Sequence, residues 1–278
     1  RWVADTLAEY GMVESLSYPF VGDEDFKAFS YDPAVIKPVS VEIANPLAGD
    51  RPYLRRDVLP TLATTVQRNL RRGLEDIRLY EIGHVYLWDL NAPAIPALPG
   101  GVRPSDEQLA ALDAGLPDQP LHVAGLLTGN AVDSGWLGDR RAVDWSDAVE
   151  AVRRVCDRLG ARYELRQPAA QDVPSQWHPG RAAQIVAGEQ VVGMVGELHP
   201  RVNEALGLPA HSAAFELNLT ALFGTLDGKP VQAKPIATFP PVKQDLAFTV
   251  DQSVTAAQLE AVVREAAGAN LESIELFD

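Results

Sequence analysis

The stretch that decides the fold runs from residue 45 to residue 88 and reads NPLAGDRPYLRRDVLPTLATTVQRNLRRGLEDIRLYEIGHVYLW. Apolar side chains recur every four residues in its first part, at Val58, Leu62, Val66 and Leu70. This spacing predicts one face of a helix, with Asp57 as its cap and Gly73 as its end. The run 77–88 is rich in strand-forming residues and carries Gly83, where we expect a bend. The stretch therefore predicts a helix followed by a strand.

Strand and helix patterns alternate on both sides of this stretch. Strands are expected at 12–20, 40–44, 121–128, 182–187, 191–198 and 213–219. Helices are expected at 1–10, 21–29 and 144–159. Six prolines and three glycines mark residues 91–120 as an insertion loop, with a short helix at 107–112.

A change of composition at GKPVQAKPIATFPP, residues 228–241, predicts a linker between two domains. Beyond it, strands are expected at 245–250 and 271–277, and Thr255 with Gln258 forms a capping box that opens a helix between them. A β-α-β unit of this kind is half of a ferredoxin-like fold. The two expected domains are residues 1–233 and residues 236–278.

Charge and cysteine content narrow the possible functions. The 278 residues carry 24 Lys and Arg against 38 Asp and Glu, a net charge of −14, so any contact with RNA must use a local patch. The single cysteine, Cys156, excludes an intrachain disulfide and a multi-cysteine metal site. The five histidines are scattered without a ligand spacing, so no metal site is expected. The chain does not begin with Met, and we expect it to be a piece of a longer polypeptide.

Signatures of nucleotide loops and nucleophiles are missing from the sequence. It contains no GxGxxG, no GxxxxGK[ST] and no GxSxG. Cys156 lies on the apolar face of the helix expected at 144–159, where it is interpreted as a small buried hydrophobe. No apolar run approaches the roughly 18 residues of a membrane span.

One basic cluster stands out in this acidic chain. Residues 51–72 hold six arginines and one acidic residue, Asp57. Five of these arginines are the candidate basic face, namely Arg55, Arg56, Arg68, Arg71 and Arg72. The cluster is either a solvated helix end that complements the helix dipole or a docking surface for an acidic partner or phosphate.

Two short motifs, WHPGR at 177–181 and GELHP at 196–200, each place a histidine before a proline, beside a charged residue and a strand. The simplest interpretation is a structured turn with a hydrogen-bonded histidine.

In this order, the motifs resemble the β subunit of bacterial phenylalanyl-tRNA synthetase, as a C-terminal fragment. The stretches that carry the resemblance are 45–72, 78–86, 144–160, 177–186 and 195–202. Residues 239–254 are similar to the opening of that subunit's ferredoxin-fold anticodon-binding domain. The residues that match the family motifs are Asn45, Pro46, Glu81, Gly83, His178, Pro179, Gly180, Arg181, Glu197, His199 and Pro200.

The resemblance implies an α+β fold: a class II synthetase-like antiparallel sheet with flanking helices, then the first half of a ferredoxin-like domain. It also implies that no catalytic residue lies on this chain. A working class II site uses an arginine two residues before a glutamate, whereas Arg78 and Glu81 are three apart and would face opposite sides of a strand. The glycine-bearing strand 193–196 is followed by Glu197 and His199 rather than by an arginine. ATP and Mg²⁺ would then serve the assembled enzyme, with no cofactor or metal on this chain.

The partners implied by the resemblance are a catalytic α subunit, in an α2β2 heterotetramer, and tRNA(Phe) in the cytoplasm, with no membrane. The candidate basic face would meet the α subunit or lie near the tRNA, and Lys243 is a candidate on the anticodon side. Two alternatives remain open. One is a free-standing class II-like amino acid ligase, and the other is a protein-interaction module unrelated to translation.

Overall fold

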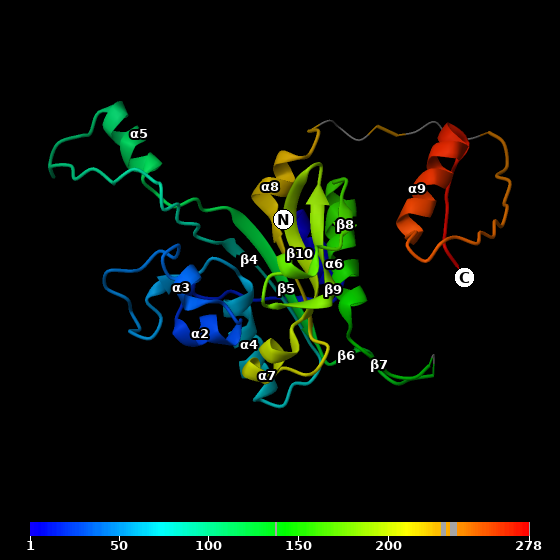
Figure 1. Ribbon diagram of the computed structural model, residues 1–278, viewed down its shortest axis with the longest axis horizontal. Coiled ribbons are helices and arrows are strands. Elements are labelled where there is room, and N and C mark those ends of the chain that lie inside the picture. The colour runs from blue at the N-terminus through cyan, green and yellow to red at the C-terminus, as the bar shows by residue number, and fades with distance from the viewer. Residues whose placement is uncertain (137, 229–231, 234–237, 278) are drawn as a thin grey trace. The chain divides into compact units, whose positions relative to one another are not determined.

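The computed structural model describes all residues except 137, 229–231, 234–237 and 278 (Figure 1). The chain divides into two compact units, Arg1–Asp227 and Gly228–Asp278. The expected boundary, between residues 233 and 236, falls mainly outside the described residues. Among the residues that are described, no helix is both long enough and apolar enough to cross a bilayer.

A seven-stranded sheet forms the centre of the first unit. In spatial order its strands are β1 (Val13–Glu14), β4 (Ile77–His84), β5 (Leu121–Thr128), β11 (Ala213–Asn218), β10 (Gln190–Leu198), β9 (Trp177–Ala187) and β8 (Glu164–Arg166). Neighbouring strands are antiparallel except at one edge, where β1 is parallel to β4. The expected purely antiparallel sheet is therefore wrong at this edge. The long connection between β1 and β4 carries several helices, which allows a parallel crossover instead of a hairpin.

Helices cover both faces of this sheet (Figure 1). One face, here called the α6 face, packs against α1 (Trp2–Glu9), α6 (Trp145–Leu159) and α8 (Leu219–Gly224). The opposite face, the α4 face, packs against α4 (Leu59–Leu70) and α7 (Pro200–Leu206). Two further short helices, α2 (Asp23–Ala28) and α3 (Pro33–Ile36), precede α4 in the chain. The predicted helices around residues 62 and 150 are thus confirmed, and each lies on its own face.

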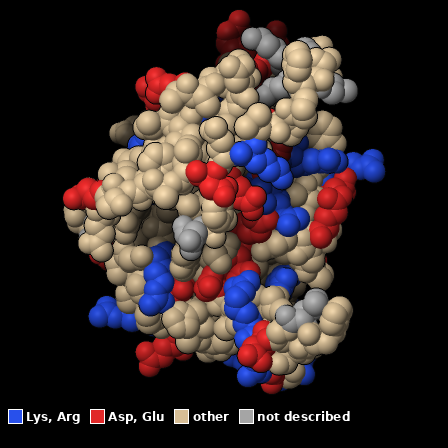
Figure 2. Space-filling model, turned by 90° about the vertical axis from the view of Figure 1, so that its right-hand side faces the viewer, with Lys and Arg blue, Asp and Glu red and all other residues tan. Residues whose placement is uncertain are grey.

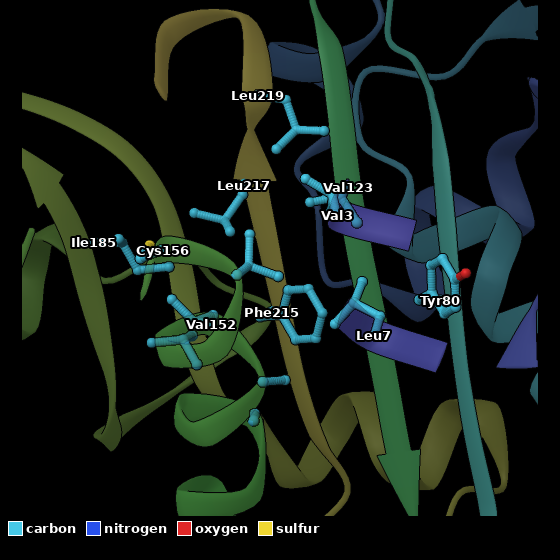
Figure 3. Packing of buried hydrophobic residues seen from close by; sticks show 14 of the residues in the cluster. Val3, Leu7, Tyr80, Val123, Val152, Cys156, Ile185, Phe215, Leu217 and Leu219 are labelled. Carbon is cyan, nitrogen blue, oxygen red and sulfur yellow. The ribbon is translucent and has the colours of Figure 1, made fainter. Parts of the chain in front are cut away.

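The α6 face is filled by apolar side chains. Figure 3 shows the ring of Phe215 between Val152 of α6 and Leu7 of α1. Gly125 of β5 lies in register with Phe215, and a Cβ added there would approach the ring to 2.2 Å. A glycine at this position lets the aromatic ring lie flat against the sheet. The predicted cap of α6 is confirmed, since the Asp144 carboxylate accepts from the Ser146 N–H at 2.8 Å.

Smaller elements connect the sheet and its helices. They are the strand pairs β2 (Phe20–Val21) with β3 (Tyr53–Leu54) and β6 (Asn130–Val132) with β7 (Arg141–Ala142), the helix α5 (Asp106–Ala114) and the 3-10 turn η1 (Ala170–Asp172). The strand expected at 12–20 is split into β1 and β2, which pair with different partners. The strand expected at 40–44 is reduced to one bridge between Glu42 and Tyr53. The short helix in the insertion loop is confirmed.

The second unit holds one helix, α9 (Ala256–Ala267), followed by the 3-10 turn η2 (Gly268–Asn270). Its capping box forms as predicted, with the Thr255 hydroxyl accepting from the Gln258 N–H at 3.3 Å. The strands expected at 245–250 and 271–277 do not form in the described part of this unit. Two short strands and one helix bury too little apolar surface to hold a sheet by themselves, and neither segment has a strand partner among the described residues.

Candidate functional site

A buried ion pair joins α4 to the sheet. The Arg55 Nη1 donates to the Glu81 Oε1 at 2.6 Å and to the Thr61 Oγ1 at 2.8 Å. The two charged side chains are 4% and 1% exposed. The Arg55 Nε also donates to the carbonyl oxygen of His84 at 3.1 Å. Arg55 therefore fastens the segment before α4 to both the middle and the end of β4.

Gly83 makes room for this arginine. We expected a bend at Gly83, but β4 continues through it to His84, so that expectation was wrong. A Cβ at this position would lie 2.1 Å from the Arg55 Nη2. The glycine is explained by the close approach of a guanidinium group rather than by a change of strand direction.

Glu216 of β11 lies on the α4 face of the sheet and caps the N-terminus of α4. Its Oε1 accepts from the Val58 N–H at 2.9 Å, and its Oε2 accepts from the Leu59 N–H at 3.2 Å. Its Oε1 also lies 2.8 Å from the His122 Nδ1. A carboxylate at a helix N-terminus satisfies free amide groups and interacts favourably with the helix dipole. The cap of α4 is thus supplied by a residue distant in sequence, and the expectation of an Asp57 cap was wrong.

Asp57 instead accepts a hydrogen bond from the Tyr31 hydroxyl at 2.7 Å. Burial, and after it the nearby charge of Glu216, raises the pKa of Asp57 to about 6. The pKa of Tyr31 is also raised, first by burial and then by the charge of Asp57. Two carboxylates therefore lie under the start of α4: the buried Glu216 is paired with amides, and the half-buried Asp57 is paired with a phenol.

Arg78 and Glu81 lie on opposite faces of β4, as their spacing predicts. Glu81 is engaged by Arg55 on the α4 face. The Arg78 guanidinium donates to the carbonyl oxygens of Asn130 and Ala131 on the other side. Both groups are therefore committed to contacts within the chain. Among the described residues, no cluster of three or more His, Cys, Asp or Glu side chains is placed to hold a metal ion.

The five arginines predicted to form one basic face do not share a surface. Arg55 is buried, so its assignment to that face was wrong. Arg56 is half-buried and donates to the carbonyl oxygen of Val39. Arg68, Arg71 and Arg72 are exposed at the C-terminal end of α4. Charges elsewhere are mixed, since acidic and basic side chains lie interleaved on the face shown in Figure 2.

In both His-Pro motifs the histidine side chain bonds the backbone two residues on. The His178 Nδ1 accepts from the Gly180 N–H at 3.1 Å, and the His199 Nδ1 accepts from the Arg201 N–H at 3.1 Å. The expected hydrogen-bonded histidines are thus confirmed, but the expected turn is wrong for WHPGR, which lies within β9, and GELHP runs from β10 into α7 with His199 as the N-cap. Leu198 pairs with Trp177 across β9 and β10, so the two motifs are neighbours.

Another buried carboxylate, that of Glu197, lies near these two motifs. The Arg181 Nη1 donates to its Oε2 at 2.7 Å, and the His211 Nδ1 lies 3.0 Å from the same oxygen. The Glu197 side chain is 4% exposed, whereas those of its two partners are about half exposed. Of the remaining candidates, the family-motif residue Asn45 and the anticodon-side candidate Lys243 are exposed, and the family-motif residue Pro46 is half-buried.

Several residues of the hydrogen-bonding networks around the buried charges were not found by the sequence analysis, namely Tyr31, Thr61, His122, His211 and Glu216. One of them carried a usable signal. Glu216 is the only charged residue in the strand AAFELN, and the alternation of that strand places it on the same face as Ala214. A charged side chain at an inward position needs a buried partner. The partner, an uncapped helix start 157 residues earlier, could not be identified from spacing.

Cys156 has the character expected for it. It lies buried among the apolar residues of the α6 face. Burial raises the pKa of its thiol to about 12, which keeps the thiol protonated and unreactive at neutral pH. Its interpretation as a small hydrophobe is confirmed.

The fold is shared with aminoacyl-tRNA synthetases. Two solved structures of pyrrolysyl-tRNA synthetase from Desulfitobacterium hafniense align with a TM-score of 0.53 over 80% of this chain and 65–66% of theirs, at 15% identity. This likeness concerns the fold alone, a mixed sheet with helices on both faces.

The sequence gives the particular family. Residues 1–219 match the phenylalanyl tRNA synthetase beta chain CLM domain, and residues 237–278 match the ferredoxin-fold anticodon binding domain. The chain therefore belongs to the family of phenylalanyl tRNA synthetase beta chains, and the resemblance seen in the sequence is confirmed.

Three curated relatives, each named phenylalanine–tRNA ligase beta subunit, align with the whole chain. The relative from Bifidobacterium longum is 78% identical, that from Thermobifida fusca 41% and that from Streptomyces avermitilis 43%. This chain covers 32%, 33% and 33% of their lengths, respectively. It spans about a third of the proteins that it matches.

Proposed function

We propose that this chain is a non-catalytic part of a phenylalanine–tRNA ligase β subunit, which pairs with the catalytic α subunit and helps to position tRNA(Phe). In an α2β2 assembly in the cytoplasm, phenylalanine would be attached to tRNA with ATP and Mg²⁺, and the α subunit would supply the catalytic groups. Residues 1–233 would be the inactive class II synthetase core. Residues 236–278, with Lys243, would belong to the anticodon-binding domain.

The main support for a non-catalytic role is that Arg78 and Glu81, the charged residues of β4, are both occupied by contacts within the chain. A site for ATP needs cations that are free to meet phosphate charge. Arg55 is locked onto Glu81 in the buried ion pair, and Arg78 is turned to the opposite face, where it bonds two backbone carbonyls. These residues do not fit ATP, so no catalytic step is assigned to this chain.

Strand β11, which is followed directly by helix α8, also supports the non-catalytic role. β11 passes into α8 at Leu219, and residues 213–224 contain no arginine. At the centre of this strand stands Glu216, whose carboxylate caps α4 instead of contacting a substrate. The polar groups of this sheet face therefore serve the fold.

The test is co-expression of the chain with a catalytic α subunit, followed by size-exclusion chromatography with light scattering. We expect one peak with the mass of a complex, and no pyrophosphate exchange by the chain alone. Exchange by the isolated chain would support a free-standing ligase. Two separate peaks, also when the full-length β subunit is used, would contradict the proposal.

The exposed arginines at the end of α4 are proposed to meet the α subunit or to lie near the tRNA. The variant Arg68→Glu/Arg71→Glu should weaken one of the two binding reactions at least tenfold, because it turns two positive charges into negative ones. The control is Arg103→Glu/Arg162→Glu, a double reversal at two other exposed arginines. If both binding reactions survive in the first variant, these arginines have no such role.

A further inference from the structure

A small cavity lies beside the two His-Pro motifs. It measures about 300 Å³ and brings together three segments that are distant in sequence. Its lining residues are Ser30, Val173, Pro174, Ser175, Trp177, Pro179, His199 and Arg201. None of these is acidic, although the chain carries 38 acidic residues and a net charge of −14. A neutral-to-basic pocket is therefore a local exception on this molecule.

The polar groups of the cavity are hydrogen-bond donors. The His199 Nδ1 accepts the Arg201 N–H, so the neutral ring carries its proton on Nε2, which is then a donor. Burial, with the charges of Arg201 and His178, lowers the pKa of His199, which favours this neutral form. Arg201 is exposed and forms no ion pair with any described residue. Its guanidinium group offers five further N–H donors and accepts nothing.

Two serine hydroxyls complete the set. Ser30 and Ser175 are exposed at the cavity, and neither hydroxyl forms a side-chain hydrogen bond with another described residue. Trp177 also lines the cavity and is buried, at 2% exposure. A compact arrangement of one guanidinium, one imidazole N–H and two hydroxyls matches a small anion with several acceptor oxygens.

We infer that this cavity binds a phosphate group of an RNA backbone, through Arg201, His199 and the hydroxyls of Ser30 and Ser175. The inference rests on the proposed function, which makes tRNA a ligand of the assembled enzyme. Arginine, serine and similar donors make most protein contacts with backbone phosphates. A carboxylate of a partner protein also has two charged oxygens that accept up to four hydrogen bonds, and the experiment below separates it from a backbone phosphate by whether tRNA binding or subunit association is lost.

The experiment uses the ligase assembled from the full-length β subunit and the α subunit, with tRNA(Phe) binding measured between 50 and 200 mM salt. Arg201→Gln should weaken binding about 3- to 10-fold and lower the slope of log affinity against log salt by about 0.7–0.9, as expected for one lost phosphate contact. Ser175→Ala should weaken binding by a smaller factor without changing the slope, since it removes a neutral donor.

The matched control is Arg162→Gln, which removes an exposed arginine that does not line the cavity and should leave the slope unchanged. Thermal unfolding of each variant checks that the exposed substitutions leave the fold intact. If Arg201→Gln binds tRNA(Phe) with unchanged affinity and slope, the phosphate site is refuted while the proposed function stands. If Arg201→Gln instead separates the α and β subunits, the cavity holds a protein carboxylate and the inference is wrong. If the unaltered ligase fails to bind tRNA(Phe), the proposed function falls as well.

Discussion

The two faces of the central sheet are built on different principles. On the α6 face, apolar side chains such as Phe215, Val152 and Leu7 meet without polar partners (Figure 3). On the α4 face, the apolar cluster is interrupted by buried charges, with Arg55 on Glu81 and Glu216 on the start of α4. Charged groups on the first face, Arg78 and the ion pair of Asp147 with Arg141, lie outside its apolar cluster, which depends on complementary shape. On the second face each charge buried within the cluster needs a partner.

The two faces therefore differ in how much a small change of structure costs. An apolar face tolerates small errors of packing, because each contact contributes little. A buried ion pair does not tolerate the loss of either partner, because the remaining charge is then buried with neither water nor an opposite charge beside it. In this chain, the charged groups buried on the α4 face bond one another and the backbone. Its charges set how α4 lies on β4, β5 and β11.

The largest effect is expected from breaking the buried ion pair. Glu81→Gln should lower the free energy of unfolding by about 3–5 kcal/mol, because Arg55 then remains charged and buried without its carboxylate. Chemical denaturation with urea, followed by circular dichroism, measures this change.

The matched variant removes both charges. Arg55→Met/Glu81→Met should recover most of the lost stability, because two apolar side chains of similar length can fill the same space. A double variant as unstable as the sum of the single variants would show that the pair is not coupled, and the proposed contrast between the faces would fail.

The two faces also differ in how much of them could be predicted from the sequence. The stripe of α6 and its Asp144 cap were read correctly, because helix periodicity and local capping involve neighbouring residues. The hairpin β9–β10 around Gly188 was also found, because turn residues mark it locally. Local sequence patterns therefore predict most of the elements that build the apolar α6 face.

On the α4 face the apolar stripe of α4 was found in the same way, but the buried charges could not be derived from local patterns. Arg55 looked like part of an exposed basic cluster, and Asp57 looked like a helix cap, since both are charged residues just before a helix. Their true partners are Glu81 and Tyr31, which lie 26 residues away in either direction. Whether a charged residue is buried depends on a partner that is distant in sequence, and a single sequence does not show which residue that partner is.

The next effect concerns the dependence of stability on pH. The pKa of Asp57 is raised from 3.8 to about 6 in the folded chain, so between these values the folded state binds more protons than the unfolded state. Stability from this group is therefore fully present below pH 4 and decreases as the pH rises through 6. A shift of about two pH units corresponds to about 3 kcal/mol.

The measurement compares the native chain with Asp57→Asn by urea denaturation from pH 4 to pH 7. The native chain should lose about 3 kcal/mol relative to Asp57→Asn across this range. Asp139→Asn, at an exposed aspartate, is the matched control for the loss of one carboxylate. A constant difference between the native chain and Asp57→Asn would mean that Asp57 is ionised in the folded state throughout, and that its burial does not penalise its charge.

The smallest effect tests the α6 face by adding volume instead of removing charge. In Gly125→Ala the new Cβ would lie 2.2 Å from the Phe215 Cε1 and 2.9 Å from the Met12 Cε, so the ring must move. We expect a loss of about 1–3 kcal/mol in the free energy of unfolding, equal at pH 4 and pH 7 because no titratable group is involved. Adding Phe215→Leu should cost less in this variant than in the native chain, because the shorter side chain relieves the overlap. Additive costs would place the overlap elsewhere, and a pH-dependent cost would show that the two faces are coupled through the sheet.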